Sequence, residues 1–136
     1  MKLNNKSTDW IPFPDGRYRV IKAYLTNMTD TQAMAIEEMV VEAYTDRRGQ
    51  RRIKGHGAVF NHLLVELLEE GDDVNLWLDL GDEFKFRLKT PDIRSGKLFM
   101  PHVKSTFQFY PRQPWDVIGV TDFETTVDAF ELLTSR

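Results

Sequence analysis

Residues 40–53, VVEAYTDRRGQRRI, determine which of two folds the middle of the chain adopts. Read with helical spacing, this segment continues an apolar stripe that begins a few residues earlier. The stripe consists of Ala33, Ile36, Val40, Ala43 and Tyr44. Thr29 and Gln32 have the spacing of a helix capping box. This reading predicts a helix from about residue 30 to residue 44, followed by a basic loop.

The same letters also fit a hairpin, with residues 46–49, DRRG, as the turn and the glycine at positive φ. A four-residue turn would place Tyr44 opposite Arg51 and Ala43 opposite Arg52. Apolar side chains would then face basic ones on both sides of the sheet, so neither face could be buried. We therefore favour the helix and loop, and the hairpin remains the alternative.

Two further segments have clear periodicities. Residues 17–27, RYRVIKAYLTN, predict a strand with apolar side chains on both of its faces. Residues 57–70 predict the clearest helix of the chain, which Gly71 ends. The apolar stripe of this helix consists of Val59, Leu63, Leu64, Leu67 and Leu68.

Residues 75–89, NLWLDLGDEFKFRLK, predict a hairpin whose turn has three residues, 81–83. A two-residue turn would put the two apolar rows on opposite faces, whereas three residues bring them onto one face. The pairs on that face are Leu80–Phe84, Leu78–Phe86 and Leu76–Leu88. The same register predicts a surface salt bridge between Asp79 and Lys85 and a cation–π pair between Trp77 and Arg87.

The last third of the chain predicts a loop over residues 90–97, a strand over 98–110 and a short strand over 116–120. Phe107 and Phe109 share the core face of the longer strand. Thr121 and Glu124 then form a capping box for a final helix. The resulting order is β-α-α-β-β-β-(β)-α.

This order predicts an α+β fold, in which one antiparallel sheet of about four to five strands packs against two to three helices. A length of 136 residues suits one hydrophobic core. We therefore expect a single α+β domain over residues 17–136. Residues 1–16 are expected to form an extended N-terminal arm, because Pro12 and Pro14 favour extended backbone.

The composition excludes several classes of protein. The chain has no cysteine, which excludes disulfides, thiolate metal sites and thiol catalysis. Its apolar runs are far shorter than the roughly 20 residues of a membrane helix, and its first residues do not resemble a secretory signal. We therefore expect no membrane contact and a location in the cytoplasm or within a virion-type assembly.

The charge of the chain is unevenly distributed. Its formal net charge is −3, from 18 basic and 21 acidic side chains. Residues 46–54 hold five basic side chains and one acidic one, a net charge of +4, so the rest holds 13 basic and 20 acidic side chains, a net charge of −7. A basic segment on an acidic body suits steering toward a partner of opposite charge.

Two groups of residues are candidates for partner binding. In the basic loop, Arg47, Arg48, Arg51, Arg52 and Lys54 would contact either an acidic protein surface or the phosphates of a nucleic acid, with glycines 49, 55 and 57 allowing close approach of the backbone. In the arm, Trp10, Ile11 and Phe13 are too apolar to lie free in water. They pack either along their own domain or on a neighbouring subunit.

Catalytic patterns are weak. Glu83 and Lys85 form the E-x-K triplet found in Mg²⁺-dependent nucleases, with Asp72 and Asp73 upstream. His56 and His62 lack the i, i+4 spacing of a zinc site, and the spacing does not show whether His102 lies near them. We therefore predict no catalytic residues, no metal and no cofactor, and we infer no small-molecule substrate.

These observations favour a non-catalytic interaction or assembly protein, an accessory or structural component of a viral or other macromolecular assembly. Its partners would be another protein or other copies of itself, bound through the arm and the basic 46–57 loop. The alternative is a nucleic-acid-binding accessory protein that uses residues 47–54, and a Mg²⁺-dependent nuclease is a distant third.

Overall fold

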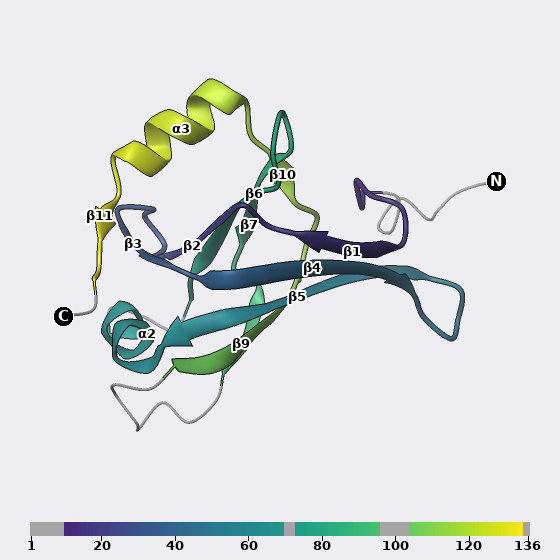
Figure 1. Ribbon diagram of the computed structural model, residues 1–136, viewed down its shortest axis with the longest axis horizontal. Helices are drawn as coiled ribbons and strands as arrows, with labels where there is room; N and C mark the ends of the chain where they lie inside the picture. The colour runs from purple at the N-terminus through teal and green to yellow at the C-terminus, as the bar shows by residue number, and fades with distance from the viewer. Residues whose placement is uncertain (1–9, 70–72, 96–103, 135–136) are drawn as a thin grey trace.

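The computed structural model describes residues 10–69, 73–95 and 104–134, which form two sheets lying face to face (Figure 1). In spatial order, the five-stranded sheet contains β1 (Gly16–Arg19), β4 (Glu37–Thr45), β5 (Arg51–Phe60), β9 (Lys104–Tyr110) and β8 (Asp92–Ser95). The six-stranded sheet contains β10 (Asp116–Val117), β7 (Lys85–Lys89), β6 (Asn75–Asp79), β2 (Lys22–Thr26), β3 (Gln32–Ala35) and β11 (Glu131–Leu132). The helices of the described residues are α2 (Asn61–Leu68) and α3 (Val120–Asp128).

The main hydrophobic core lies between the two sheets. Val41, Phe107 and Phe109 of the five-stranded sheet belong to the same buried cluster as Leu25 and Leu76 of the six-stranded sheet. All five side chains are wholly buried. The inner face of each sheet is therefore covered by the other sheet, as in a β-sandwich.

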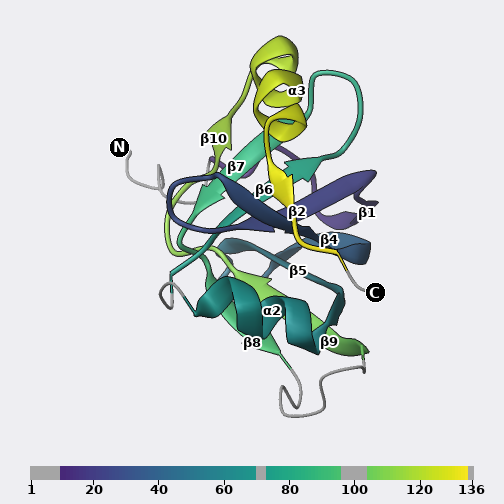
Figure 2. The same cartoon turned by 90° about the vertical axis from the view of Figure 1, so that its left-hand side faces the viewer.

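The two helices cover different parts of this sandwich (Figure 2). Phe123 of α3 and the following Phe130 bury Trp77 and Ala33 on the outer side of the six-stranded sheet. Helix α2 instead contacts β3 and β5 at one end of the sandwich. Among the described residues, no helix has the length and apolar character needed to cross a membrane.

The α+β prediction is wrong, because half of the described residues lie in strands and only 15% in helices, and the strands form two sheets rather than one sheet with helices against it. The largest error concerns residues 30–44, where the predicted helix is replaced by β3 and β4. Residues 29–32 do not cap a helix, since the side chain of Asn27 accepts the backbone N–H groups of Thr31 and Gln32 in the turn between β2 and β3.

A bulge explains why residues 30–44 imitate a helix. The pairing of β4 with β5 shifts between Glu37 and Val40, and Glu38 has a positive φ of 54°. The alternation of apolar side chains therefore breaks in the middle of the segment. Val40 and Tyr44, which the helical stripe combined with Ala43, lie on the opposite face of β4 from the buried Ala43.

Residues 17–27 form two strands in different sheets instead of one. The backbone N–H of Val20 donates to Met39 of β4, while that of Ile21 donates to Asp79 of β6. The chain thus crosses from the five-stranded to the six-stranded sheet between β1 and β2. At the crossing, the buried positions change from even-numbered residues, such as Val20, to odd-numbered ones, such as Ala23. This change is why the sequence shows apolar side chains on both faces of one apparent strand.

The hairpin over residues 75–89 is confirmed in its register. Leu76 pairs with Leu88 and Leu78 with Phe86, and the backbone N–H of Leu80 donates to the carbonyl of Phe84 at 2.9 Å. The predicted side-chain pairs are also present, with Lys85 Nζ 2.8 Å from Asp79 Oδ1 and the Arg87 guanidinium 5.6 Å from the centre of the Trp77 ring. These pairs are mostly buried rather than on the surface, because the six-stranded sheet is covered on both sides.

The remaining predictions are right in part. Helix α2 begins at Asn61, because residues 57–60 extend β5. Strand β8 lies in the segment predicted as a loop, and the part of the predicted strand over residues 98–103 lies outside the described residues. Helix α3 exists, but its N-cap is Gly119 and no side chain caps it.

Candidate functional site

The basic segment of the sequence is the tip of a long hairpin formed by β4 and β5 (Figure 1). Its loop has five residues, 46–50, closed by a hydrogen bond from the Asp46 N–H to the Gln50 carbonyl at 2.8 Å. Gly49 has the positive φ of 79° that such a loop requires at this position. The preferred helix and loop are therefore wrong, and the alternative hairpin is present.

The extra loop residue changes which side chains face each other. Tyr44 pairs with Arg52 and Ala43 with Ile53, instead of Ala43 with Arg52. Ala43 and Ile53 are consequently buried on the inner face, while Tyr44 and Arg52 lie together on the outer face. The objection to the hairpin thus disappears with a loop that is longer by one residue.

The basic residues of the hairpin lie in three settings. Arg47 and Arg48 are exposed at the tip. Arg51 reaches back to the arm, where Nε lies 3.2 Å from Asp15 Oδ1 and the guanidinium also donates to the Phe13 carbonyl.

Arg52 and Lys54 lie on the outer face of β5. Arg52 Nε is 2.7 Å from Asp46 Oδ2, and Lys54 Nζ lies 4.9 Å from the centre of the Tyr44 ring.

Two carboxylates, Asp46 of the hairpin and Asp15 of the arm, stay ionised beside these cations. The hydrogen bond from Arg52 and those from the backbone N–H groups of Gln50 and Arg48 hold the pKa of Asp46 below its usual value. The pKa of Asp15 is likewise lowered, chiefly by the hydrogen bond from Thr45 and then by Arg51. Each carboxylate therefore fixes the direction of one guanidinium.

Pairing across the five-stranded sheet adds cations from distant parts of the sequence to the same outer face. Residues directly opposite each other on neighbouring strands point to the same side. Arg17 and Arg19 of β1 pair with Glu42 and Val40, and the row continues through His56, Gln108 and Arg94. At the far end of β5, Phe60 pairs with Lys104.

We call this surface the basic face and define it by six residues: Arg17, Arg19, Arg52, Lys54, Arg94 and Lys104. The register places three carboxylates among them, those of Glu37, Glu42 and Asp92, and Asp46 lies beside Arg52, so the net charge of these ten side chains is +6 − 4 = +2. Lys104 is paired with Glu37 at 2.6 Å, while Arg17 and Arg19 are exposed. The basic face is thus cationic on a chain whose total charge is −3.

A groove of about 320 Å³ lies at the end of this face, between the β4–β5 hairpin and residues 110–114. Aromatic and guanidinium side chains share its walls, namely Trp10, Tyr44, Arg51, Arg52, Tyr110 and Arg112. Arg94 lies 5.2 Å from the centre of the Tyr110 ring, so Tyr110 connects the groove to the basic face.

Two of the three glycines of the hairpin, Gly55 and Gly57, lie against other groups of the same chain. A Cβ on Gly55 would lie 2.1 Å from Cε2 of Phe109, and a Cβ on Gly57 would lie 2.9 Å from the carbonyl oxygen of Glu37. Both positions face the core and admit neighbouring groups of this chain. The hypothesis that these two glycines let a ligand approach the backbone is therefore not supported by their surroundings.

The candidate residues of the arm pack against their own chain. Ile11 and Phe13 are 5% and 7% exposed and belong to the main core. Trp10 is half-buried, with its ring centre 5.7 Å from that of Trp115. Trp10 and Ile11 line the groove, whereas Phe13 does not and packs in the main core.

The residues considered for catalysis are not brought together. Glu83 lies in the turn between β6 and β7, while Lys85 is buried against Asp79. His56 lies on the outer face of β5 and His62 on α2, while Asp72 and His102 lie outside the described residues. Within the described ranges, no three histidine or acidic side chains are grouped so as to hold a metal ion.

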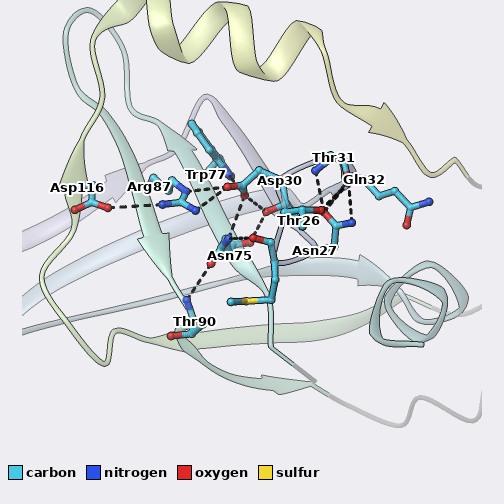
Figure 3. Close-up of polar contacts among 12 residues, drawn as sticks. Thr26, Asn27, Asp30, Thr31, Gln32, Asn75, Trp77, Arg87, Thr90 and Asp116 are labelled. Carbon is cyan, nitrogen blue, oxygen red and sulfur yellow. Dashed lines mark hydrogen bonds and ion pairs between the residues drawn. The ribbon is translucent and has the colours of Figure 1, made fainter. Parts of the chain in front are cut away.

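The most extensive polar cluster surrounds Asp30, in the turn between β2 and β3 (Figure 3). Its Oδ1 accepts hydrogen bonds from Thr26 Oγ1 at 2.6 Å, Trp77 Nε1 at 2.9 Å and Asn75 Nδ2 at 3.2 Å. Its Oδ2 accepts two from Arg87, at 2.7 and 3.1 Å. Both oxygens are thus saturated by the protein itself, which indicates a structural role.

The pKa of Asp30 reflects these contacts. Burial alone would raise it, but the hydrogen bonds from Thr26, Trp77, Asn75 and Arg87 together outweigh burial, and the pKa lies below its usual value of 3.8. The carboxylate therefore remains charged at neutral pH and ties the β2–β3 turn to β6 and β7.

Sequence reasoning found the hairpin cations but missed Arg17, Arg19, Arg94, Lys104 and Arg112. A signal was present, since Arg17 and Arg19, like Arg52 and Lys54, are cations two residues apart, the spacing of one face of a strand. Arg94 and Arg112 had no such signal, because they join the site only through the pairing of β8 with β9 and the fold of the segment that follows β9.

Comparison with known proteins adds no assignment to this geometry. A scan against protein-family models gives no match, and searches of curated proteins and of solved structures give no significant match either.

Proposed function

We propose that this chain is a non-catalytic protein that binds nucleic acid against the basic face. The observation that supports this most strongly is the sheet register, which gathers six cations from β1, β5, β8 and β9 onto the side of the sheet away from the core. Cations spread over a sheet suit a chain of phosphates better than a single anion, because each phosphate meets a different side chain. The exposed Arg47 and Arg48 extend the same charge along the hairpin.

The ion pairs of this surface are compatible with binding. Arg52, Arg94 and Lys104 each lie beside a carboxylate, and the side chains of all three are largely exposed. Exposed ion pairs contribute little to stability, so a phosphate can replace the carboxylate at small cost. The carboxylates orient these side chains in the absence of a ligand, which lowers the entropy lost on binding.

Fluorescence anisotropy with a labelled 12-nucleotide single strand tests this proposal. We expect binding at 50 mM salt that weakens by roughly 100-fold or more at 200 mM, because phosphate contacts release counterions. In the double variant Arg52→Ala/Lys54→Ala, affinity at 50 mM salt should fall about tenfold. The slope of log K against log salt should become shallower by about 1.4, two contacts at roughly 0.7 each.

The matched control removes the same charge from the other sheet. Lys22 and Lys89 are exposed ends of β2 and β7 in the six-stranded sheet, and neither belongs to the basic face. The variant Lys22→Ala/Lys89→Ala should keep the salt slope and most of the affinity. Equal losses in both variants would mean that only net charge matters, and absence of binding at 50 mM salt would refute the proposal.

Assembly with an acidic protein surface, such as that of another copy, is the second candidate. It is favoured by the opposite charges of residues 46–54, at +4, and of the rest of the chain, at −7. Light scattering after size exclusion at low salt should then show oligomers that dissociate in the variant Arg47→Ala/Arg48→Ala. A monomer at all protein concentrations and salt levels would exclude self-assembly through the hairpin.

A further inference from the structure

The walls of the groove at the end of the basic face combine guanidinium with aromatic side chains, and a site for phosphate alone would not need the aromatic ones. Three of its side chains are aromatic, Trp10, Tyr44 and Tyr110, and they come from the arm, β4 and β9. Its volume of about 320 Å³ is at the lower end of the range for small-ligand sites, roughly 300–1,000 Å³. Such a space suits one flat, partly polar group.

The two tyrosines are oriented by cations of the basic face. Lys54 lies over the ring of Tyr44 at 4.9 Å, and Arg94 lies over the ring of Tyr110 at 5.2 Å. Each cation covers one side of its ring and holds it in place by attraction to the π electrons. A group stacked on either ring inside the groove would therefore lie close to a cation that can bind a phosphate.

The rim of the groove supplies donors in fixed positions. Arg51 is held by Asp15 and the Phe13 carbonyl, and Arg52 is held by Asp46. Arg112 lies 3.7 Å from Asp92. Guanidinium groups can both stack on a base and donate to its edge or to a phosphate.

We propose that this groove takes one base of a single-stranded nucleic acid, stacked on Tyr110 or Tyr44, while the adjoining phosphates lie on the basic face. The inference rests on the proposed function and specifies it further. Binding sites for single strands combine a cationic surface with aromatic side chains that stack on bases. The groove also predicts a preference for single strands, because the bases of a duplex are paired and stacked inside it.

The decisive comparison uses the unaltered protein and two 12-nucleotide strands with identical backbones, oligo-thymidine and a fully abasic strand. We expect oligo-thymidine to bind about tenfold more tightly at the same salt concentration, and more tightly than a 12-base-pair duplex, because stacking adds to the phosphate contacts. Trp10 lines the groove, so tryptophan fluorescence should change with oligo-thymidine and not with the abasic strand.

Each other outcome has a definite meaning. Equal affinity for the two strands would overturn the groove inference, while salt-dependent binding of both would still support the proposed function. Absence of binding to either strand at 50 mM salt would overturn both. If thymidine monophosphate bound as tightly as oligo-thymidine, the occupant would be a free nucleotide, and the proposed strand would be wrong.

A pair of variants locates the stacked base. Tyr110→Leu should lower the affinity for oligo-thymidine about tenfold, toward that of the abasic strand, and leave binding of the abasic strand unchanged. Phe60→Leu is the control, because Phe60 is also half-buried on the outer face with a cation, Lys104, 5.0 Å from its ring centre, but lies outside the groove. Thermal melting of both variants verifies that they fold. Equal losses in both would overturn the assignment of stacking to the groove.

Discussion

Replacing Asp30 by alanine is expected to lower the free energy of unfolding by about 4 kcal/mol, because it leaves the partly buried Arg87 without its main partner. The Arg87 side chain is 19% exposed and lies 2.7 Å from Asp30 Oδ2. The indole N–H of Trp77 and the amide of Asn75 would lose their acceptor at the same time. Urea denaturation at pH 7 measures the loss.

Asp116 provides a matched control for this variant. It lies 3.9 Å from the same guanidinium, but its side chain is 50% exposed. Because exposed ion pairs contribute little, Asp116→Ala should change the free energy of unfolding by less than about 1 kcal/mol. If the two variants were equally stable, the Asp30 cluster would not be what ties the β2–β3 turn to the rest of the six-stranded sheet.

The pH dependence of stability has a defined sign at Asp30. Its pKa in the folded protein is below the usual 3.8, so the contribution of its carboxylate is present above pH 3.8 and is lost as the pH falls below that value. The isosteric variant Asp30→Asn lacks this contribution at every pH. The difference in the free energy of unfolding between the original protein and Asp30→Asn should therefore shrink as the pH is lowered from 5 to below 3.8.

Gly55→Val should have the second largest effect, a loss of about 3 kcal/mol in the free energy of unfolding. Even a Cβ at this position would lie 2.1 Å from the ring of Phe109, which is wholly buried and cannot move into solvent. Phe109 also packs near Trp115, with ring centres 6.3 Å apart, so a shift of one ring disturbs the other. Chemical denaturation of the purified variant measures the effect.

The control for Gly55→Val is Ala58→Val. Ala58 lies on the same strand, but the register places it on the outer face opposite Glu37 and Thr106. The added methyl groups meet no core there, and a β-branched residue suits a strand, so stability should change little. A Gly55→Val protein as stable as the original would show that Phe109 does not pack beneath β5 as described.

The parts of the fold that could be predicted are those with unbroken local patterns. The hairpin of β6 and β7 has two apolar rows and one turn, and only an odd turn length aligns Leu78 with Phe86. The segment over β3 and β4 could not be predicted in this way, because the bulge after Glu37 interrupts its alternation and creates an apparent helical spacing. The β4–β5 hairpin was rejected because its loop was assumed to have four residues after Thr45, whereas it has five.

The candidate site was predictable only in its most local part. The cations of residues 47–54 are adjacent in the sequence, so their proximity needed no fold. The basic face needed the order of strands β1-β4-β5-β9-β8, which brings Arg17 and Arg94 to the same surface although 77 positions separate them. The groove could not be predicted without knowing that the arm folds back on the domain, so that Trp10 and Tyr110 line the same space.

The most direct test of the central claim is to follow the amide signals of the ¹⁵N-labelled protein by NMR while a 12-nucleotide single strand is added at 50 mM salt. Binding against the basic face predicts that the signals that shift most belong to the five-stranded sheet (β1, β4, β5, β8 and β9) and to residues 110–114. Signals of β2, β6 and α3, on the far side of the core, should stay in place. Shifts concentrated on the six-stranded sheet, or no shifts at saturating strand concentration, would contradict the account.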